Sequence, residues 1–336
     1  MNKRIWFHKY VRLAVTAGLL TWVALDTDWA NVSNAFRQMR VEWWLAAVAM
    51  LVTTQLISAW RWQALARPFG FERKIRQMAS YYFVGMYFNL LLPTSVGGDV
   101  VRAWYLDGGT GRRLAALGAV FLDRFSGLVV LLCLACIGLL LTPLELPAWI
   151  GWFVWTTTAC AAVAIAVTPW LTRRGARIAN SLHKVRAGLE KLRAPDLLLG
   201  STALSLGVQA GNVILVWLVG QSISADVPAG YYWIMVPMVS LLTMLPVSIN
   251  GWGVRENATV LFLAPLGIAK DTAVTLSLLW FAVFLAGSLM GGAVYLFGNF
   301  PRVDDPALAP DFTEVDHGSV DHRADQGRTR QHHSVA

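Results

Sequence analysis

Two copies of one short motif contain most of the residues that could do chemistry. Residues 92–102 read LPTSVGGDVVR and residues 245–255 read LPVSINGWGVR, with six identical positions at the same spacing. Each copy follows a short apolar segment, at 79–92 and 231–247. Proline removes a backbone donor and ends a helix, whereas glycine permits tight turns and close approach of a ligand. The motif therefore predicts a break in a helix, repeated in two places.

Positive charge at these breaks would make them sites for anions. Arg102 and Arg255 close the two motifs, and a guanidinium group offers a planar fork that suits phosphate. Freed backbone N–H groups at the start of a new helix also attract negative charge. Asp99 and Glu256 flank the arginines and could pair with them, or the arginines could extend into water at the interface. A phosphodiester headgroup would fit such a site.

Two more charged residues are expected inside the membrane. Asp123 and Arg124 lie well within the apolar span 114–141. Charges within spans are rare and costly, so each is a candidate for function, with a structural ion pair between helices as the alternative. Neighbouring residues on a helix point about 100° apart, so these two are expected to face different partners. Arg102 is one candidate partner for Asp123.

Other polar and small residues have structural interpretations beside functional ones. Asn89 and Asn250 would supply polar contacts at the breaks or only cap the freed backbone. Arg61 lies between two tryptophans at a helix end, which favours anchoring in the aromatic belt of the interface. The sequence GSLMG at 287–291 has small residues four apart, which indicates close packing of helices.

The elements that must position these residues are membrane helices. The chain has 336 residues and is 56% hydrophobic and 14% charged, whereas soluble domains are about 25% charged. The two apolar segments before the motifs are short, since an arm of about 14 residues covers about 21 Å of a hydrocarbon core about 30 Å thick. The fold class is therefore an all-α integral membrane protein, a polytopic helical bundle with two re-entrant broken-helix hairpins. Six full crossings are predicted, at 10–25, 43–60, 114–141, 150–169, 197–221 and 272–298.

Basic residues in the loops predict the orientation of these spans. They gather before the first span, after the second and in the loop 171–195, which places those parts and both termini on the cytoplasmic side of a cell (inner or plasma) membrane. Three crossings then separate the two motifs, so the second copy is inverted. This predicts a transmembrane domain over 1–300 with inverted repeat halves at about 5–142 and 150–299, as in secondary transporters. A polar tail at 301–336 should be disordered and cytoplasmic.

Composition also argues against several classes of function. The net charge of +8 lies mostly in short loops between spans, so it indicates orientation and attraction to lipid, and no nucleic-acid partner is expected. No histidine falls in a predicted span, which argues against an intramembrane metal site. The sequence also has no P-loop for a nucleotide. We expect no cofactor and no catalytic residues.

At these residues the chain resembles a known family. The two breaks, the LDRFSG segment at 122–127 and the Arg-Trp pair at 61–62 are similar to the flippase-like transmembrane domain of lysylphosphatidylglycerol synthases, over about residues 5–300. In full-length synthases this domain is thought to move aminoacylated phosphatidylglycerol between leaflets, while a separate soluble domain makes that lipid. We expect a stand-alone member without the soluble domain. The resemblance then implies movement of lipid and not aminoacyl transfer.

Motifs and resemblance together give a candidate substrate-binding set. The family's motif residues map to Pro93, Gly97, Gly98, Asp99, Arg102, Asp123, Arg124, Asn250, Gly251, Arg255 and Glu256. The set of candidate site residues keeps all of these except Pro93 and adds Asn89, Ser95 and Ser248.

Three hypotheses for function follow from this set. The first is a flippase that moves an anionic or aminoacylated phospholipid, or a lipid-linked intermediate, between leaflets. The second is an accessory subunit with partner proteins in an envelope lipid or glycan synthesis complex. This hypothesis does not explain the matched polar breaks. The third is an enzyme that modifies a polyprenyl-phosphate or a phospholipid, which the short outer loops disfavour.

Overall fold

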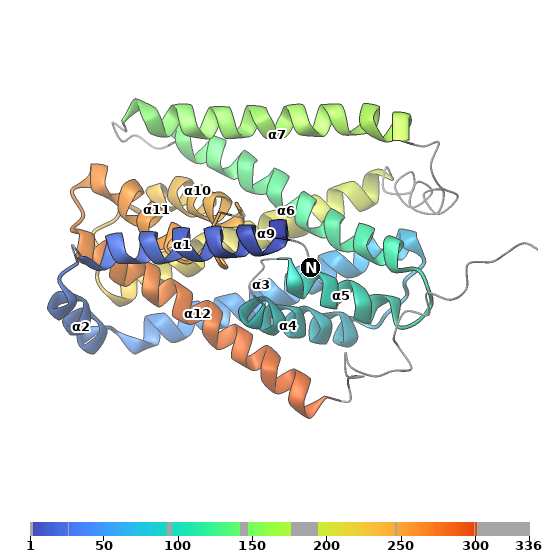
Figure 1. Ribbon diagram of the computed structural model, residues 1–336, viewed down its shortest axis with the longest axis horizontal. Coiled ribbons are helices and arrows are strands. Elements are labelled where there is room, and N and C mark those ends of the chain that lie inside the picture. Colours follow the sequence, from blue (N-terminus) through green and yellow to red (C-terminus); the bar gives the residue numbers. More distant parts are fainter. Residues whose placement is uncertain are drawn as a thin grey trace, which may run out of the picture. The chain divides into compact units, whose positions relative to one another are not determined.

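A computed structural model describes residues 3–25, 27–92, 96–141, 147–175, 194–245, 247–298 and 300. All regular elements in these ranges are helices, as the sequence predicts (Figure 1). The α-helices are α1 (Lys3–Leu25), α2 (Trp29–Gln38), α3 (Val41–Ala66), α4 (Ile75–Leu91), α5 (Gly97–Asp107), α6 (Arg113–Leu141), α7 (Ala148–Gly175), α9 (Pro195–Ser222), α10 (Tyr232–Met244), α11 (Val254–Leu263) and α12 (Lys270–Phe297). Short 3-10 turns at Arg67–Phe69, Ala229–Tyr231 and Ala264–Leu266 link some of them.

The compact unit Met1–Asn299 contains all of these helices, and Phe300–Ala336 forms a separate unit. The predicted polar tail at 301–336 lies outside the described residues, as do Pro93, Ser95 and Pro246 of the two motifs.

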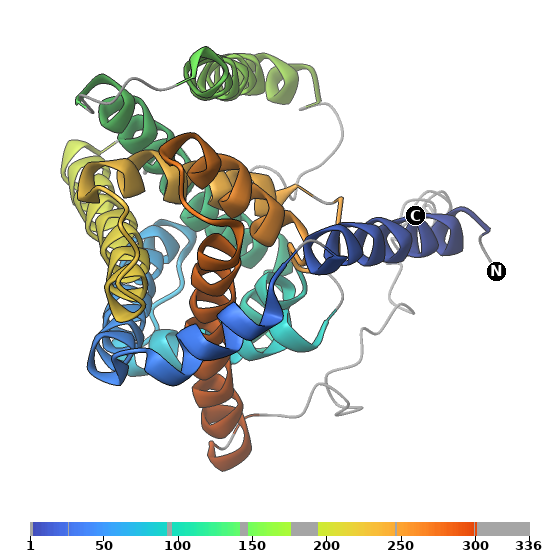
Figure 2. The same cartoon turned by 90° about the vertical axis from the view of Figure 1, so that its left-hand side faces the viewer.

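Among the described residues, four helices are long and apolar enough to cross a membrane. They span Val41–Phe69, Arg113–Leu141, Pro195–Ser222 and Lys270–Phe297. These four match predicted crossings. In α1, the part whose side chains are described contains the apolar stretch Leu13–Leu25. Helix α7 is 28 residues long and lies beside α6 (Figure 2). The total of six crossings stays a prediction.

The first motif lies at the tip of an antiparallel helical hairpin. The rings of Tyr81 on α4 and Tyr105 on α5 stack with centroids 5.4 Å apart. Nearer the break, the backbone N–H of Gly98 donates to Asn89 Oδ1 at 2.8 Å. Tyr81 lies beside Tyr105, and the later residue Asn89 lies beside the earlier residue Gly98. The helices α4 and α5 therefore run in opposite directions.

The second motif closes a hairpin of the same kind. The Tyr231 hydroxyl donates to the carbonyl oxygen of Phe262, far from the break. Gly251 packs against Thr243 close to the break. The arms α10 and α11 are therefore antiparallel as well. Both hairpins have the form that re-entrant segments need, although their depth in a membrane stays a prediction.

The packing between helices repeats in the two halves. The hairpin arm α4 packs against α12 of the second half, and the hairpin arm α10 packs against α6 of the first half. Within each half the second arm packs on the long helix that follows it, α5 on α6 and α11 on α12. The first long helices, α3 and α9, lie against each other. Each hairpin is thus held by a helix from the opposite half.

Small residues let α12 approach its neighbours closely. A Cβ atom on Gly291 would lie 2.0 Å from the carbonyl oxygen of Phe83 on α4, and one on Gly287 would lie 2.5 Å from Leu51 Cδ2 on α3. The backbones can approach this closely only because no side chain intervenes. The predicted role of the 287–291 segment in helix packing is confirmed.

Candidate functional site

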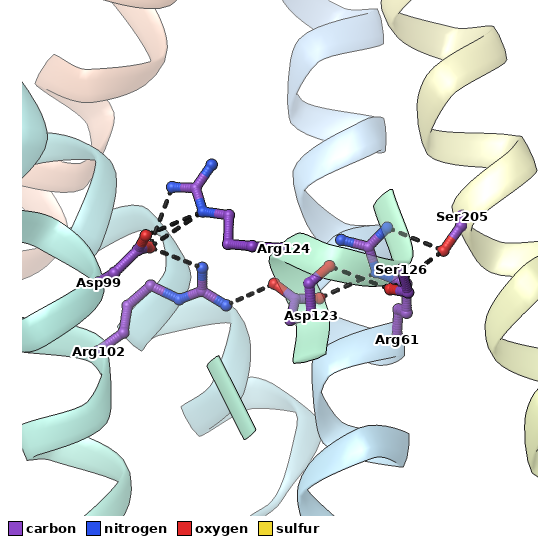
Figure 3. Close-up of polar contacts among 7 residues, drawn as sticks. All are labelled: Arg61, Asp99, Arg102, Asp123, Arg124, Ser126 and Ser205. Carbon is purple, nitrogen blue, oxygen red and sulfur yellow. Dashed lines mark hydrogen bonds and ion pairs between the residues drawn. The ribbon is translucent and has the colours of Figure 1, made fainter. Parts of the chain in front are cut away.

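A buried carboxylate joins three helices at the centre of the candidate site. Asp123 on α6 accepts hydrogen bonds from Arg61 Nε on α3 and from Arg102 Nη2 on α5, each at 2.9 Å (Figure 3). The two guanidinium groups bind different carboxylate oxygens. All three side chains are buried. The predicted pair of Asp123 and Arg102 is confirmed, and Arg61 is a third member.

The chain of charges continues from Arg102 to the surface of the protein. Arg102 Nη1 donates to Asp99 Oδ1 at 3.3 Å, so the expected local pair forms. Arg124 donates to both oxygens of Asp99, with shortest distances of 3.0 Å to each (Figure 3). The order is therefore Arg61, Asp123, Arg102, Asp99 and Arg124, which alternates in sign and carries one net positive charge.

Helix geometry explains why two adjacent residues serve opposite ends of this chain. Asp123 and Arg124 are neighbours on α6, and side chains one residue apart point about 100° away from each other. Asp123 therefore faces α3 and the buried side of α5, whereas Arg124 reaches Asp99 in the first turn of α5. The prediction that they face different partners is confirmed.

Aromatic rings hold the Arg102 side chain in place. Its guanidinium carbon lies 4.2 Å from the ring centroid of Trp62 and 3.9 Å from that of Tyr82. Gly85 on α4 leaves room for its aliphatic part, because a Cβ there would lie 2.6 Å from Arg102 Cγ. Cation–π contacts stabilise a desolvated guanidinium by about 2 kcal/mol or more. Among the described residues, Arg102 Nε is buried without a hydrogen-bond partner.

The two breaks meet through one asparagine. Asn250 in the second break donates through Nδ2 to the carbonyl oxygens of Asn89 and Leu92, both at 3.1 Å. These carbonyls end α4, immediately before the first break. Asn250 has a φ of 52°, the left-handed conformation that asparagine tolerates better than most residues. Both asparagines bond to backbone groups at the first break, which is the capping interpretation of their role.

The second motif repeats part of the arrangement around Arg102. Arg255 is buried over the ring of Phe281, with its guanidinium carbon 4.9 Å from the centroid. Arg255 Nε lies 3.6 Å from Glu256 Oε1, so this local pair forms too. Glu256 also accepts from the backbone N–H of Gly253 at 2.7 Å, which caps α11. Ser248 is buried, and its hydroxyl has no partner among the described residues.

Helix α1 covers the second break. The backbone N–H of Ile249 donates to Thr16 Oγ1 at 2.9 Å, and Asn257 Nδ2 donates to the carbonyl oxygen of Leu19 at 3.0 Å. Gly253 leaves the space for this contact, since a Cβ there would lie 2.6 Å from Leu19 Cβ. The break is therefore fixed on one side by α1 and on another by the end of α4.

The prediction for Arg61 is wrong. It was expected to anchor a helix end at the interface, but its side chain is buried and bonded to Asp123 and to Ser205 Oγ at 3.0 Å. The flanking tryptophans dominated the interpretation, although Trp62 faces the core and Trp60 is exposed. The spacing of Thr54, Ser58 and Arg61 places them on one face of α3, and this polar face indicated the burial of Arg61 better than the tryptophans did.

A row of polar residues on α9 was not predicted. Ser205 contacts Ser126 at 3.4 Å and Arg61, and Gln209 Nε2 donates to the carbonyl oxygen of Gly127 at 3.0 Å. Asn212 in turn donates to Gln209. Serine, glutamine and asparagine recur every three or four residues from Ser201, so the helical periodicity was available in the sequence. These residues extend the polar contacts of the site from α6 to α9.

Comparison with known proteins agrees with this picture. Searches of curated proteins and of solved structures found no match to the chain. Residues 10–291 match the family model described as the lysylphosphatidylglycerol synthase TM region. Because this match covers most of the chain, and because several helices are long and apolar, the chain is a multi-pass membrane protein that belongs to the lysylphosphatidylglycerol synthase TM region family.

Proposed function

We propose that this protein is a transporter that moves an anionic or aminoacylated phospholipid, or a lipid-linked intermediate, between the leaflets of the cell membrane. In this proposal both termini are cytoplasmic, and partner proteins of envelope synthesis supply or use the lipid. The membership in a lipid-related membrane family supports the lipid as substrate.

The meeting of the two breaks carries the proposal. Asn250 bonds to the end of α4, so both interrupted hairpins share one location in the fold. Matched broken helices that face each other are the usual site of substrate binding in transporters built from repeats. The arginine-rich chain beside the first break carries a net positive charge that suits a phosphate group.

The same geometry favours transport over covalent chemistry. Both oxygens of Asp123 accept bonds from arginines, and Asp99 accepts from two arginines. A general base must be free to take a proton from a substrate, and these carboxylates are already engaged. We therefore propose that the protein is not an enzyme.

Leaflet exchange in reconstituted vesicles tests the function. A headgroup-labelled anionic phospholipid is quenched from outside, with aminoacylated and polyprenyl-linked lipids as further substrates. Protein-containing vesicles should lose the label of both leaflets, whereas protein-free vesicles should lose only the outer label. If none of these lipids moves faster than in protein-free vesicles, the transporter proposal fails and an accessory subunit becomes the better hypothesis.

The contact between the breaks gives a prediction within this assay. Asn250→Gly removes two hydrogen bonds but keeps a residue that adopts a positive φ without strain. Hydrogen bonds contribute about 0.5–1.5 kcal/mol each, so exchange should slow by about tenfold. Ser224→Gly is the matched control, because Ser224 also has a positive φ, at 51°, and lies outside the breaks. Equal rates for both variants would show that the contact between the breaks is irrelevant to transport.

A further inference from the structure

Only one end of the charged chain is open. The side chains of Arg61, Asp123 and Arg102 are at most 4% exposed, whereas Arg124 is 44% exposed and Asp99 is 13% exposed. A ligand that approaches this cluster therefore meets Arg124 first. The inner members are positioned to fix Asp99 and α5 and not to contact the ligand directly.

The surface around this open end is apolar. On α6, Leu117 and Phe121 precede Arg124 at helical spacing and are 41% and 65% exposed. Val96, which immediately precedes α5, and Val100 in its first turn lie on either side of Asp99 and are also exposed. In a membrane protein, exposed apolar side chains face the acyl chains of the bilayer. The pair of Arg124 and Asp99 is thus a charged site bordered by lipid-facing residues, which suits a ligand with a polar head and apolar tails.

Asp99 can leave Arg124 without losing all of its partners. It accepts bonds from Arg124 through both oxygens, and it also accepts from Arg102 at 3.3 Å. If a phosphate took its place on Arg124, Asp99 would still be paired with Arg102. A phosphate oxygen pair matches the guanidinium fork as well as a carboxylate does. The exchange of one anion for another leaves no buried charge unpaired.

The charge of the cluster selects the class of ligand. Three arginines face two aspartates, so the empty site carries one net positive charge. A lipid whose headgroup has a single phosphodiester and no amine brings one negative charge and neutralises the site. A zwitterionic headgroup would leave it charged, and a phosphomonoester brings additional negative charge.

From these observations we propose that Arg124 binds the phosphate of a lipid with a single phosphodiester and one net negative charge, which enters from the bilayer and displaces Asp99 from Arg124. This deepens the proposed function by naming the headgroup class and the first residue that it meets. Asp99 acts as an internal competitor for the ligand, and its removal should therefore strengthen binding.

Equilibrium binding of spin-labelled lipids to the full chain in zwitterionic bilayers tests the proposal. The wild type should bind the anionic phosphodiester lipid more tightly than a zwitterionic lipid with the same acyl chains. Arg124→Gln should lower affinity for the anionic lipid by about tenfold, because it removes a charge-assisted bidentate contact. Asp99→Asn should raise that affinity by several-fold. Arg124→Lys keeps the charge and should restore part of the preference, which separates loss of charge from loss of fold.

A second pair of an arginine on α6 and an aspartate on α5 controls for general attraction of lipid to arginine. Arg113 is 49% exposed and lies 3.9 Å from Asp107, close to the start of the same helix. Arg113→Gln should change the affinity for the anionic lipid by less than twofold. A water-soluble glycerophosphodiester should not displace the lipid. If the soluble compound displaces the lipid, the inference that the ligand enters the site from the bilayer is wrong.

The two substitutions, Asp99→Asn and Arg124→Gln, should change the affinity for the anionic lipid in opposite directions. This difference decides between a ligand site and a structural ion pair. If Asp99→Asn weakens binding as much as Arg124→Gln does, the pair is structural and the proposal is wrong. This result does not depend on leaflet exchange, since binding is measured at equilibrium. If the protein binds the anionic lipid selectively but does not exchange it between leaflets, only the transporter proposal is wrong. If Arg124→Gln still exchanges lipid with an unchanged headgroup preference, only the Arg124 site is wrong.

Discussion

Asp123→Asn is expected to lower the free energy of unfolding by about 3–5 kcal/mol, the range measured when one partner of a buried ion pair is removed. Asp123 is fully buried and is the common partner of Arg61 and Arg102, which are also buried. Asparagine has the same shape but no charge, so two guanidinium groups would remain without their carboxylate. Unfolding of the purified protein in mixed micelles, followed by tryptophan fluorescence, measures the change.

A double-mutant cycle identifies the cause of this loss. Arg61→Gln combined with Asp123→Asn removes one cation and one anion together, and the coupling free energy should be about 1–3 kcal/mol. Asp196→Asn is the control, because Asp196 is an exposed residue in the first turn of α9. Its effect should stay below about 1 kcal/mol. If Asp123→Asn is as stable as the control variant, the buried ion pairs do not hold α3, α5 and α6 together.

The hairpins could be predicted because their determinants are local. Proline and glycine act on the backbone of their own segment, so the repeated motif marked the ends of α4 and α10 without knowledge of the fold. The pairing of Asp123 with Arg102 was also accessible. A charge inside a span needs a counterion, and few oppositely charged residues were expected at that depth.

The rotation of each long helix could not be predicted in the same way. Arg61 has an exposed tryptophan on one side and a buried one on the other, so its own burial depends on which face of α3 meets α6 and α9. Hydrophobicity gives little help, because in a membrane both the lipid-facing side and the core side of a helix are apolar. Polar spacing along α3 and α9 carried the information instead.

The meeting of the breaks is a tertiary property as well. Asn250 and Asn89 are separated by 161 residues in sequence, and nothing local indicates which residue of one break contacts the other. The docking of α1 on the second break includes the bond from the Ile249 N–H to Thr16 and the bond from Asn257 to the Leu19 carbonyl oxygen, and no local pattern marks either of them. Such contacts follow from the packing of α4 on α12 and of α10 on α6, which sets the distance between the two hairpins.

The two halves differ in charge more than their motifs indicate. Arg102 belongs to a five-membered chain with Asp123 on the following long helix, whereas Arg255 has Glu256 beside it and Ser277 of α12 bonded to that carboxylate. The second arginine is therefore neutralised by its neighbour, and the first half retains the net positive charge. This asymmetry places the candidate anion site in the first half, with the second half acting mainly to position it.

Gly98→Ala is expected to have the second large effect, by preventing α4 and α5 from closing. A Cβ on Gly98 would lie 1.9 Å from the carbonyl oxygen of Gly85 and 2.8 Å from Asn89 Oδ1. The first contact is with backbone, so a side-chain rotation cannot relieve it. Overpacking of this kind costs about 1–3 kcal/mol, occasionally more. Thermal unfolding in detergent should show the loss, and leaflet exchange should fall because Asp99 and Arg102 follow on the same helix.

Two further variants make this prediction specific. Gly207→Ala adds the same methyl group within α9, where nothing lies within 4 Å, and it should leave stability unchanged or raise it by up to about 1 kcal/mol. Asn89→Ala should not rescue Gly98→Ala, since it relieves only the side-chain contact and removes the acceptor for the Gly98 N–H. Rescue by Asn89→Ala would mean that the hairpin arms can separate slightly without loss of the site. Failure of rescue, with Gly207→Ala unaffected, would show that the approach of the Gly85 and Gly98 backbones sets the position of α5 and its charges.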